Sequence, residues 1–353
     1  MRKVRDYNKN VDPSYLETLF ESGMSWEEVA AKAGLSSGAA ASSRVYRYRN
    51  GPDASPQEVN FSKVVLPEDF DLAGALDIAD RLQELMDSVD PIVTSAELFF
   101  PDRPMAVMWT SCAHLGGRYT WHEGVREAFD KILKVPNLYV ALLGDEIEGF
   151  LPGFRDASAV TNQLLPIKIQ RKMLAAYLKR WSDAGKVLFG CSSQHGGEWF
   201  EAAVGMNPIK EEFHNTQTPY FDGKGILKLW IGQELYVGAV AHSFKGSSIY
   251  NPNHPQRRAT LFDYPSADLA VMGDKHKYAV QHMSDRVDEY RAGLRPSPLV
   301  WHIQVGTAKI GSDPYTIRGW QHGYFEWPVM VFYPDRHLIK QCFEIDDLKW
   351  MLK

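Results

Sequence analysis

An apolar run that ends in a glycine and a carboxylate constrains the fold more than any other feature of this sequence. Residues 138–143 are apolar throughout, as is typical of a buried strand in a parallel sheet. Gly144, which permits a sharp turn, and Asp145 follow directly. Because open α/β sheets bind their ligands at the carboxyl ends of their strands, we expect Asp145 to lie at a functional edge.

The alternation of strands and helices predicts the rest of the architecture. Apolar stretches predict strands at 105–110, 137–143, 186–190, 235–241, 268–272 and 299–305. Helical spacing predicts helices at 121–134, 161–182 and 254–263. The tail predicts a closing β-hairpin around Pro334 and Asp335. Strands that first alternate with helices and then follow one another favour a layered α/β sandwich over a (β/α)8 barrel.

Five of the predicted strands end in loops whose side chains can bind a metal or move a proton. These side chains are, in chain order, Cys112, His114, Asp145, Gln194, His195, His242, Asp274 and His276. Each histidine taken singly fits a hydrogen-bonded core residue, and Cys112 fits a buried, inert thiol. Their joint placement at strand ends favours a metal centre.

The order of the five loops resembles the calcineurin-like metallophosphoesterases, whose motifs are D-x-H, G-D-x-x-[DE], G-N-H-[DE], a lone His and G-H-x-H. The resemblance covers about residues 104–310, and the second motif, Gly144-Asp145-x-x-Glu148, is complete. The segments His242–His254 and Gly273–His276 are similar to members found in bacteriophages. The resemblance implies an αββα fold of two sheets flanked by helices, and hydrolysis of a phosphate ester.

The resemblance also implies two divalent metal ions, which could be manganese, zinc or iron. It assigns to the first metal Cys112, His114, Asp145 and His276. It assigns to the second metal Asp145, Gln194, His242 and Asp274.

Three of these positions depart from the family pattern: Cys112 replaces an Asp, Gln194 an Asn, and Asp274 a His. Each replacement can still coordinate a metal, which favours a retuned site over one that has lost its metals. A thiolate at Cys112 would favour zinc or ferrous iron over magnesium, whereas Asp274 pulls the other way.

The chemistry explains why these residue types are needed. Two cations can bind the oxygens of a phosphate and lower the pKa of a bridging water, with Asp145 as the ligand they share. His195, at the position of the family's catalytic histidine, would protonate the leaving oxygen or stabilise its charge.

Residues 1–55 predict a separate small helical unit. Pro13 and Gly23 delimit a first helix, and Ser25 with Glu28 forms a capping box for a second helix that ends at Gly34. A third helix, opened by Ser36 or Ser37, carries Arg44, Arg47 and Arg49. This pattern is typical of a helix-turn-helix that binds nucleic acid, and a protein-docking unit is the alternative.

Residues 56–103 are expected to hold a linker and a bridging helix, and residues 104–353 the phosphoesterase domain. A Pro- and Ser-containing linker is predicted over 51–66, and the apolar spacing from Leu72 to Val89 predicts a helix. We expect this helix to pack on the main domain or to bridge the two. Arg257 and Arg258 could meet a phosphate backbone near the cleft, or lie on a helix face without a function.

Charge and cysteine content limit the partners. The net charge of −5 offers no global attraction to nucleic acid, so any such binding must be local. Three cysteines without a framework spacing indicate a reducing compartment. The basic N-terminus is followed by no apolar stretch, and no window is apolar enough to span a membrane. We therefore expect a cytoplasmic protein (in a host cytoplasm if viral), no membrane partner, and possible homo-oligomers.

The leading hypothesis is a metal-dependent phosphoesterase that hydrolyses a phosphodiester in DNA, tethered by the N-terminal unit. One alternative is a catalytically silent relative that serves as a nucleic-acid- or protein-binding scaffold. Another is a phosphomonoesterase or cyclic-nucleotide esterase in which the N-terminal unit serves only assembly.

Overall fold

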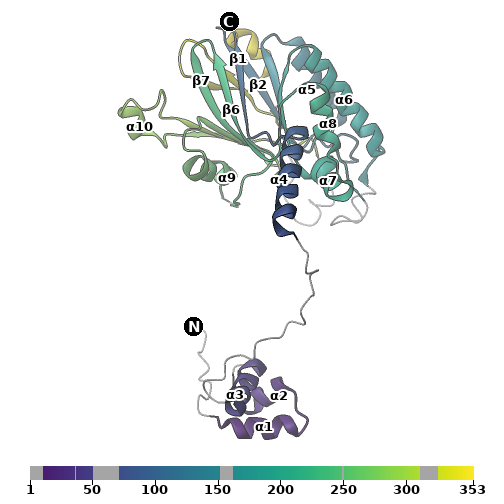
Figure 1. Cartoon of the computed structure of the whole chain (residues 1–353). Coiled ribbons are helices and arrows are strands. Elements are labelled where there is room, and N and C mark those ends of the chain that lie inside the picture. Colours follow the sequence, from purple (N-terminus) through teal and green to yellow (C-terminus); the bar gives the residue numbers. More distant parts are fainter. Residues whose placement is uncertain (1–10, 36, 51–70, 152–161, 249, 311–324) are drawn as a thin grey trace. The chain divides into compact units, whose positions relative to one another are not determined.

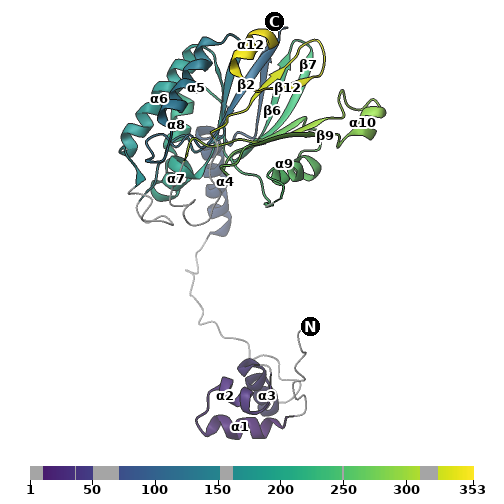
Figure 2. The same ribbon diagram turned by 180° about the vertical axis from the view of Figure 1, so that it is seen from behind.

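The computed structural model describes residues 11–35, 37–50, 71–151, 162–248, 250–310 and 325–353. The chain divides into two compact units, Met1–Glu84 and Leu85–Lys353, which are drawn from opposite sides in Figures 1 and 2. The linker predicted over residues 51–66 lies outside the described residues.

The N-terminal unit contains the three predicted helices, α1 (Pro13–Glu21), α2 (Trp26–Lys32) and α3 (Gly38–Asn50). The capping box is present, because the Ser25 hydroxyl accepts from the Glu28 backbone and the Glu28 carboxylate accepts from the Ser25 backbone. A small apolar core holds the helices together, formed by Leu16, Leu19, Val29, Ala30, Ala33, Leu35, Ala41 and Val45. A fourth helix, α4 (Leu72–Val89), has the predicted bounds, and none of its residues is buried.

The first sheet of the second unit has the strand order β12-β11-β2-β3-β4-β5. Its members are β2 (Met105–Thr110), β3 (Leu138–Leu142), β4 (Val187–Cys191), β5 (Tyr220–Phe221), β11 (Val329–Phe332) and β12 (Ile339–Cys342). Strands β2 to β5 are parallel, while β11 runs antiparallel to both β2 and β12. The predicted C-terminal hairpin is thereby confirmed, and it extends this sheet.

The second sheet has the order β1-β6-β7-β8-β10-β9. Its members are β1 (Ser95–Phe100), β6 (Lys224–Ile231), β7 (Glu234–Ala241), β8 (Leu269–Met272), β9 (Ala279–Met283) and β10 (Val300–Gln304). Strands β7, β8 and β10 are parallel to one another. Four strands were not predicted, namely β1, β5, β6 and β9.

Alternating side chains divide the unit into layers. Val107 and Trp109 point between the sheets, where they join Leu269 and Val271, while Met108 points to the opposite face of its sheet. Helices α5 (His122–Lys134), α6 (Ile167–Asp183) and α8 (Pro208–Asn215) cover the first sheet, and α9 (His254–Arg258) contacts the second. The predicted sandwich of two sheets flanked by helices is confirmed. Short helices α7 (Trp199–Val204), α10 (Val287–Arg291) and α12 (Leu348–Met351) complete the unit.

Candidate metal centre

Backbone hydrogen bonds tie the strand-end loops to one another. The amide of Cys112 donates to the carbonyl of Gly144 (2.9 Å), and the amide of His114 donates to that of Asp145 (3.0 Å). The Asp145 amide donates to the hydroxyl of Ser193 (2.7 Å). The loops after β2, β3 and β4 are thus joined at one edge of the first sheet.

The loops of the second sheet meet this edge through a glycine. The amide of Gly273 donates to the carbonyl of His242 (3.1 Å), which joins the loops after β8 and β7. A Cβ on Gly273 would lie 1.8 Å from the hydroxyl oxygen of Ser111, in the loop after β2. Only glycine allows the two sheets to approach this closely here.

Five of the predicted ligand positions have a left-handed backbone. Seven non-glycine residues in the described part of the chain have a positive φ, between 46° and 64°. Five of the seven are Cys112, His114, Asp145, Asp274 and His276. Such conformations are unfavourable for most residues and concentrate at functional sites, where the surrounding structure imposes them.

The side chains of these loops form three groups of three residues. Within each group, the ligand atoms lie within 4.8 Å of one another. The groups are Cys112 with His114 and His276, Cys112 with Asp145 and His242, and His114 with Asp145 and His195. A thiol, imidazoles and a carboxylate are the donors of zinc and iron sites. The donor set therefore fits a divalent metal, and Cys112, His114 and Asp145 each belong to two of the three groups.

Two histidines are oriented by backbone carbonyls. His242 donates through Nδ1 to the carbonyl of Leu143 (2.6 Å), and its Nε2 lies 3.3 Å from Oδ2 of Asp145. His195 donates through Nδ1 to the carbonyl of Glu148 (2.7 Å), and its Nε2 lies 3.8 Å from the same oxygen. In both residues the Nε2 atom is left to face a cation or a substrate.

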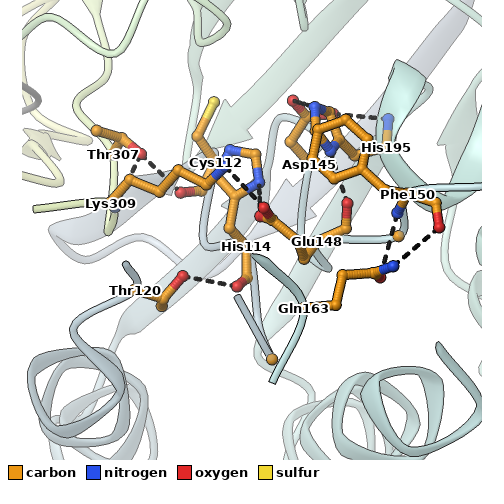
Figure 3. A network of polar contacts seen from close by, with 12 residues as sticks. Cys112, His114, Thr120, Asp145, Glu148, Phe150, Gln163, His195, Thr307 and Lys309 are labelled. Carbon is orange, nitrogen blue, oxygen red and sulfur yellow. Dashed lines mark hydrogen bonds and ion pairs between the residues drawn. The ribbon is translucent and has the colours of Figure 1, made fainter. Parts of the chain in front are cut away.

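His114 belongs to a buried chain of charged groups (Figure 3). Its Nδ1 lies 3.0 Å from one carboxylate oxygen of Glu148, and the other oxygen accepts from Nζ of Lys309 (2.9 Å). The Nε2 of His114 lies 3.2 Å from the Nε2 of His276. A carboxylate behind a ligating histidine fixes the ring and makes it a better ligand, and here a buried lysine fixes the carboxylate in turn.

Burial and neighbouring charges set the protonation states. Burial, opposed by Glu148, lowers the pKa of His114 to about 4, and burial next to His114 lowers that of His276 to about 3. Both imidazoles are therefore neutral near pH 7. Burial disfavours a charge on Glu148, but His114 and Lys309 outweigh it and lower the carboxyl pKa to about 2.

Around Asp145, the neighbouring charges shift the pKa values in other directions. Burial opposes protonation of His242, but the Asp145 carboxylate outweighs burial and raises the pKa of His242 to about 9. Although burial favours the protonated form of Asp145, His242 and His195 outweigh burial and hold the pKa of Asp145 well below its usual range. Burial and the Asp145 charge raise the pKa of the Cys112 thiol. A cation would have to displace these protons, so its binding would be pH-dependent.

Two predicted ligands are not brought into these groups. The Asp274 carboxylate accepts from the Ser243 hydroxyl (2.8 Å) and from Nζ of Lys275 (2.5 Å). Gln194 is exposed and opens the turn Gln194–Glu198, in which His195 and Gly196 have a non-helical backbone. Their assignment to a second metal stays a prediction.

The predicted phosphate-binding arginines are largely engaged in ion pairs. Arg49 contacts Glu17 and Glu21, Arg257 lies 3.1 Å from Asp285, and Arg258 lies 3.3 Å from Asp263. Arg44 is partly exposed on α3, and the side chain of Arg47 lies outside the described residues. Binding of nucleic acid by these five residues stays a prediction.

Sequence reasoning missed three residues that support the site. Lys309 was not singled out, although a lysine in an apolar context near the end of the resembling region is a usable signal. Ser193 bonds the Asp145 amide, and the Thr307 hydroxyl donates to the carbonyl of Cys112 (3.0 Å). Neither carried any signal, because hydroxyl–backbone bonds leave no spacing pattern.

No protein-family model and no curated protein matches this chain. Solved structures do resemble it at low identity. Vps29 of Entamoeba histolytica, solved with zinc, has 10% identity and a TM-score of 0.30 over 67% of this chain and 97% of that chain. TT1561 of Thermus thermophilus has 11% identity and a TM-score of 0.34 over 67% and 98%. A metallophosphoesterase of Sphaerobacter thermophilus has 13% identity and a TM-score of 0.29 over 70% and 92%.

None of the described helices combines the length and the apolar character that crossing a bilayer requires. All three cysteines, Cys112, Cys191 and Cys342, are buried and unpaired with one another.

Proposed function

We propose that this chain is a metal-dependent phosphoesterase. The observation that carries the proposal is that a thiol, histidines and a carboxylate from five strand-end loops form three overlapping groups of three, with the ligand atoms of each group within 4.8 Å of one another. Four of these residues, Cys112, His114, Asp145 and His276, have a left-handed backbone. Cys112, His114, Asp145, His242 and His276 would hold the metal. A divalent cation there would polarise a phosphoryl oxygen and make a water more acidic.

The protein's own residues then have distinct roles. Glu148 and Lys309 hold the His114 ring, and the carbonyl of Leu143 holds the His242 ring. The Nε2 of His195 faces the same region with its tautomer fixed by the Glu148 carbonyl, so it can exchange a proton with a leaving oxygen. The aromatic rings of Phe150 and Trp199 pack against His195, with ring centroids 4.5 and 4.8 Å away, and limit its movement.

The proposed substrate is a phosphodiester, with DNA as the candidate that the N-terminal unit favours. Exposed Tyr46 and Tyr48 and partly exposed Arg44 on α3 support contacts to a nucleic acid. Arg44→Ala should weaken DNA binding by the full chain and reduce its salt dependence, whereas Lys32→Ala on α2 serves as the matched control.

The test of the activity is hydrolysis of an artificial phosphodiester with added manganese. Asp145→Asn should hydrolyse the substrate at least about 10³-fold more slowly than the wild type. Asn has the size of Asp and tolerates the left-handed backbone, so the loop should keep its shape. His195→Ala should lose about 10²- to 10⁴-fold. Equal rates for the wild type and both variants would refute the proposal.

One observation favours a silent scaffold as the second candidate. The Asp274 carboxylate accepts hydrogen bonds from Lys275 and Ser243, and Gln194 is exposed, so both side chains have surroundings that do not require a second cation. Elemental analysis of protein purified without chelator separates the candidates. Absence of metal, together with no gain in thermal stability when metals are added, would favour the scaffold.

A further inference from the structure

Helix α4 carries an apolar stripe with the spacing of a coiled-coil seam. Apolar side chains recur at alternating intervals of three and four residues along its whole length, at Leu72, Ala75, Ala79, Leu82, Met86 and Val89. This is the a and d pattern of helices that pair along a shared seam. Leu76, Ile78 and Leu85 lie at the flanking e and g positions and widen the stripe.

The stripe is open along its whole length. Each of the seven large apolar side chains is between 55% and 72% exposed: Leu72, Leu76, Ile78, Leu82, Leu85, Met86 and Val89. Scattered apolar residues are normal on a protein surface, but a contiguous patch marks an interaction surface. An 18-residue helix of this kind gains most of its stability from a partner that covers its apolar side.

The charges of α4 limit the kinds of partner that the stripe can bind. Asp77, Asp80, Glu84 and Asp87 all fall at b and f positions, on the side away from the seam. The one basic residue of the helix, Arg81, lies 3.0 Å from Asp77. Helices that lie on membranes or bind phosphate chains carry Lys and Arg beside their apolar face, and α4 does not. An identical helix brings the same spacing to the seam and places no carboxylate in it.

We propose that α4 pairs with α4 of a second copy of this chain. A stable dimer buries roughly 800 Å² on each partner, and seven large apolar side chains in one stripe supply the apolar core of such an interface. Pairing would also bring two N-terminal units into one particle. Two such units are what helix-turn-helix proteins use to bind two half-sites.

The test is sedimentation equilibrium of the full chain between about 1 and 100 µM. The wild type should be a dimer, and Leu82→Asp, which places a carboxylate at the centre of the seam, should weaken association at least about 100-fold. Ala73→Asp adds the same carboxylate at an exposed b position and should leave the dimer intact.

Two results would overturn the proposal. The first is a wild type that stays monomeric over the whole range, and the second is a dimer that survives Leu82→Asp. If the wild type is monomeric, a melting temperature that falls with Leu82→Asp but not with Ala73→Asp would show that the stripe is covered by its own chain. Circular dichroism of both variants checks that α4 remains helical.

Discussion

The two sides of the candidate metal centre differ in the contacts that hold their side chains in place. On the thiol side, His114 is grouped with Cys112 and His276, and a buried chain runs from His114 through Glu148 to Lys309. On the carboxylate side, Asp145 and His242 contact each other, but Asp274 is occupied by neighbours and Gln194 is exposed. The ligands of the two sides therefore differ in the contacts behind them, and such contacts orient a ligand and tune its affinity for a metal.

We therefore expect the thiol side to bind a metal more tightly than the carboxylate side. The Cys112 thiolate and the two neutral imidazoles of His114 and His276 suit zinc or ferrous iron, and the buried Glu148–Lys309 ion pair holds His114 in place. Four measurements test this expected difference in metal affinity.

The largest effect is expected from Cys112→Ser. The hydroxyl is a far weaker ligand than a thiolate, so zinc affinity should fall at least about 100-fold. Competition with a chromophoric chelator measures the affinity, and loss of the thiolate-to-metal absorption band in the cobalt-loaded protein reports the donor directly. Cys191→Ser is the matched control, since Cys191 is equally buried but belongs to none of the ligand groups. A full cobalt–thiolate band in Cys112→Ser would contradict the assignment.

Lys309→Met tests the role of the Glu148–Lys309 ion pair behind His114. Without the ammonium, Glu148 is left buried with only His114 as a partner, and the imidazole loses its fixed orientation. We expect a 10- to 100-fold loss of metal affinity on the thiol side. Lys309→Arg should restore part of that affinity. A Lys309→Met protein that is less stable but binds metal as well as the wild type would show that the lysine is only structural.

The pH dependence of stability tests the carboxylate side. Since the pKa of His242 is raised from 6.5 to about 9, its protonated form stabilises the metal-free fold fully below pH 6.5, and this contribution is lost as the pH rises to 9. With a chelator present to keep the protein metal-free, His242→Gln should therefore have a melting temperature several degrees below that of the wild type at pH 6. The difference should be smaller at pH 9.5. If the difference in melting temperature between the wild type and the variant is the same at both pH values, His242 is not charged in the folded protein.

Asp274→Asn should have the smallest effect. If the carboxylate serves only Lys275 and Ser243, phosphodiesterase activity should fall less than about 3-fold, and Lys275→Met should change it no more. A loss above about 100-fold for Asp274→Asn alone would show that Asp274 ligates a second metal. The two sides of the site would then be equivalent in function.

Much of the fold could be predicted from the sequence, because short stretches of consecutive apolar residues are typical of buried strands. The stretch ending at Gly144 became β3, and the helix from Leu72 to Val89 has the predicted bounds. The missed strands had weaker signals. Strand β5 has only two residues, and β9 is half-exposed and interrupted by polar side chains. Strand β6 does alternate between buried and less buried residues, and this pattern was readable.

The candidate site could be predicted as a set of positions but not as an arrangement. Strand ends named Cys112, Asp145 and His242 correctly as neighbours, since parallel strands bring their carboxyl ends together. The ion pair of Asp274 with the adjacent Lys275 and the buried bond of Lys309 to Glu148 depend on side-chain directions. Those directions follow from the packing of distant segments, which no local pattern encodes.

The left-handed backbone at five ligand positions also limits what can replace them. Asn, Asp, His and Gly tolerate that conformation, whereas β-branched and bulky residues do not. Selection for the loop shape alone would thus retain many residues that look like metal ligands, in an active and in a silent protein alike. Variants that respect the backbone, such as Asp145→Asn or His276→Asn, are therefore the ones that separate the loss of a ligand from the loss of a fold.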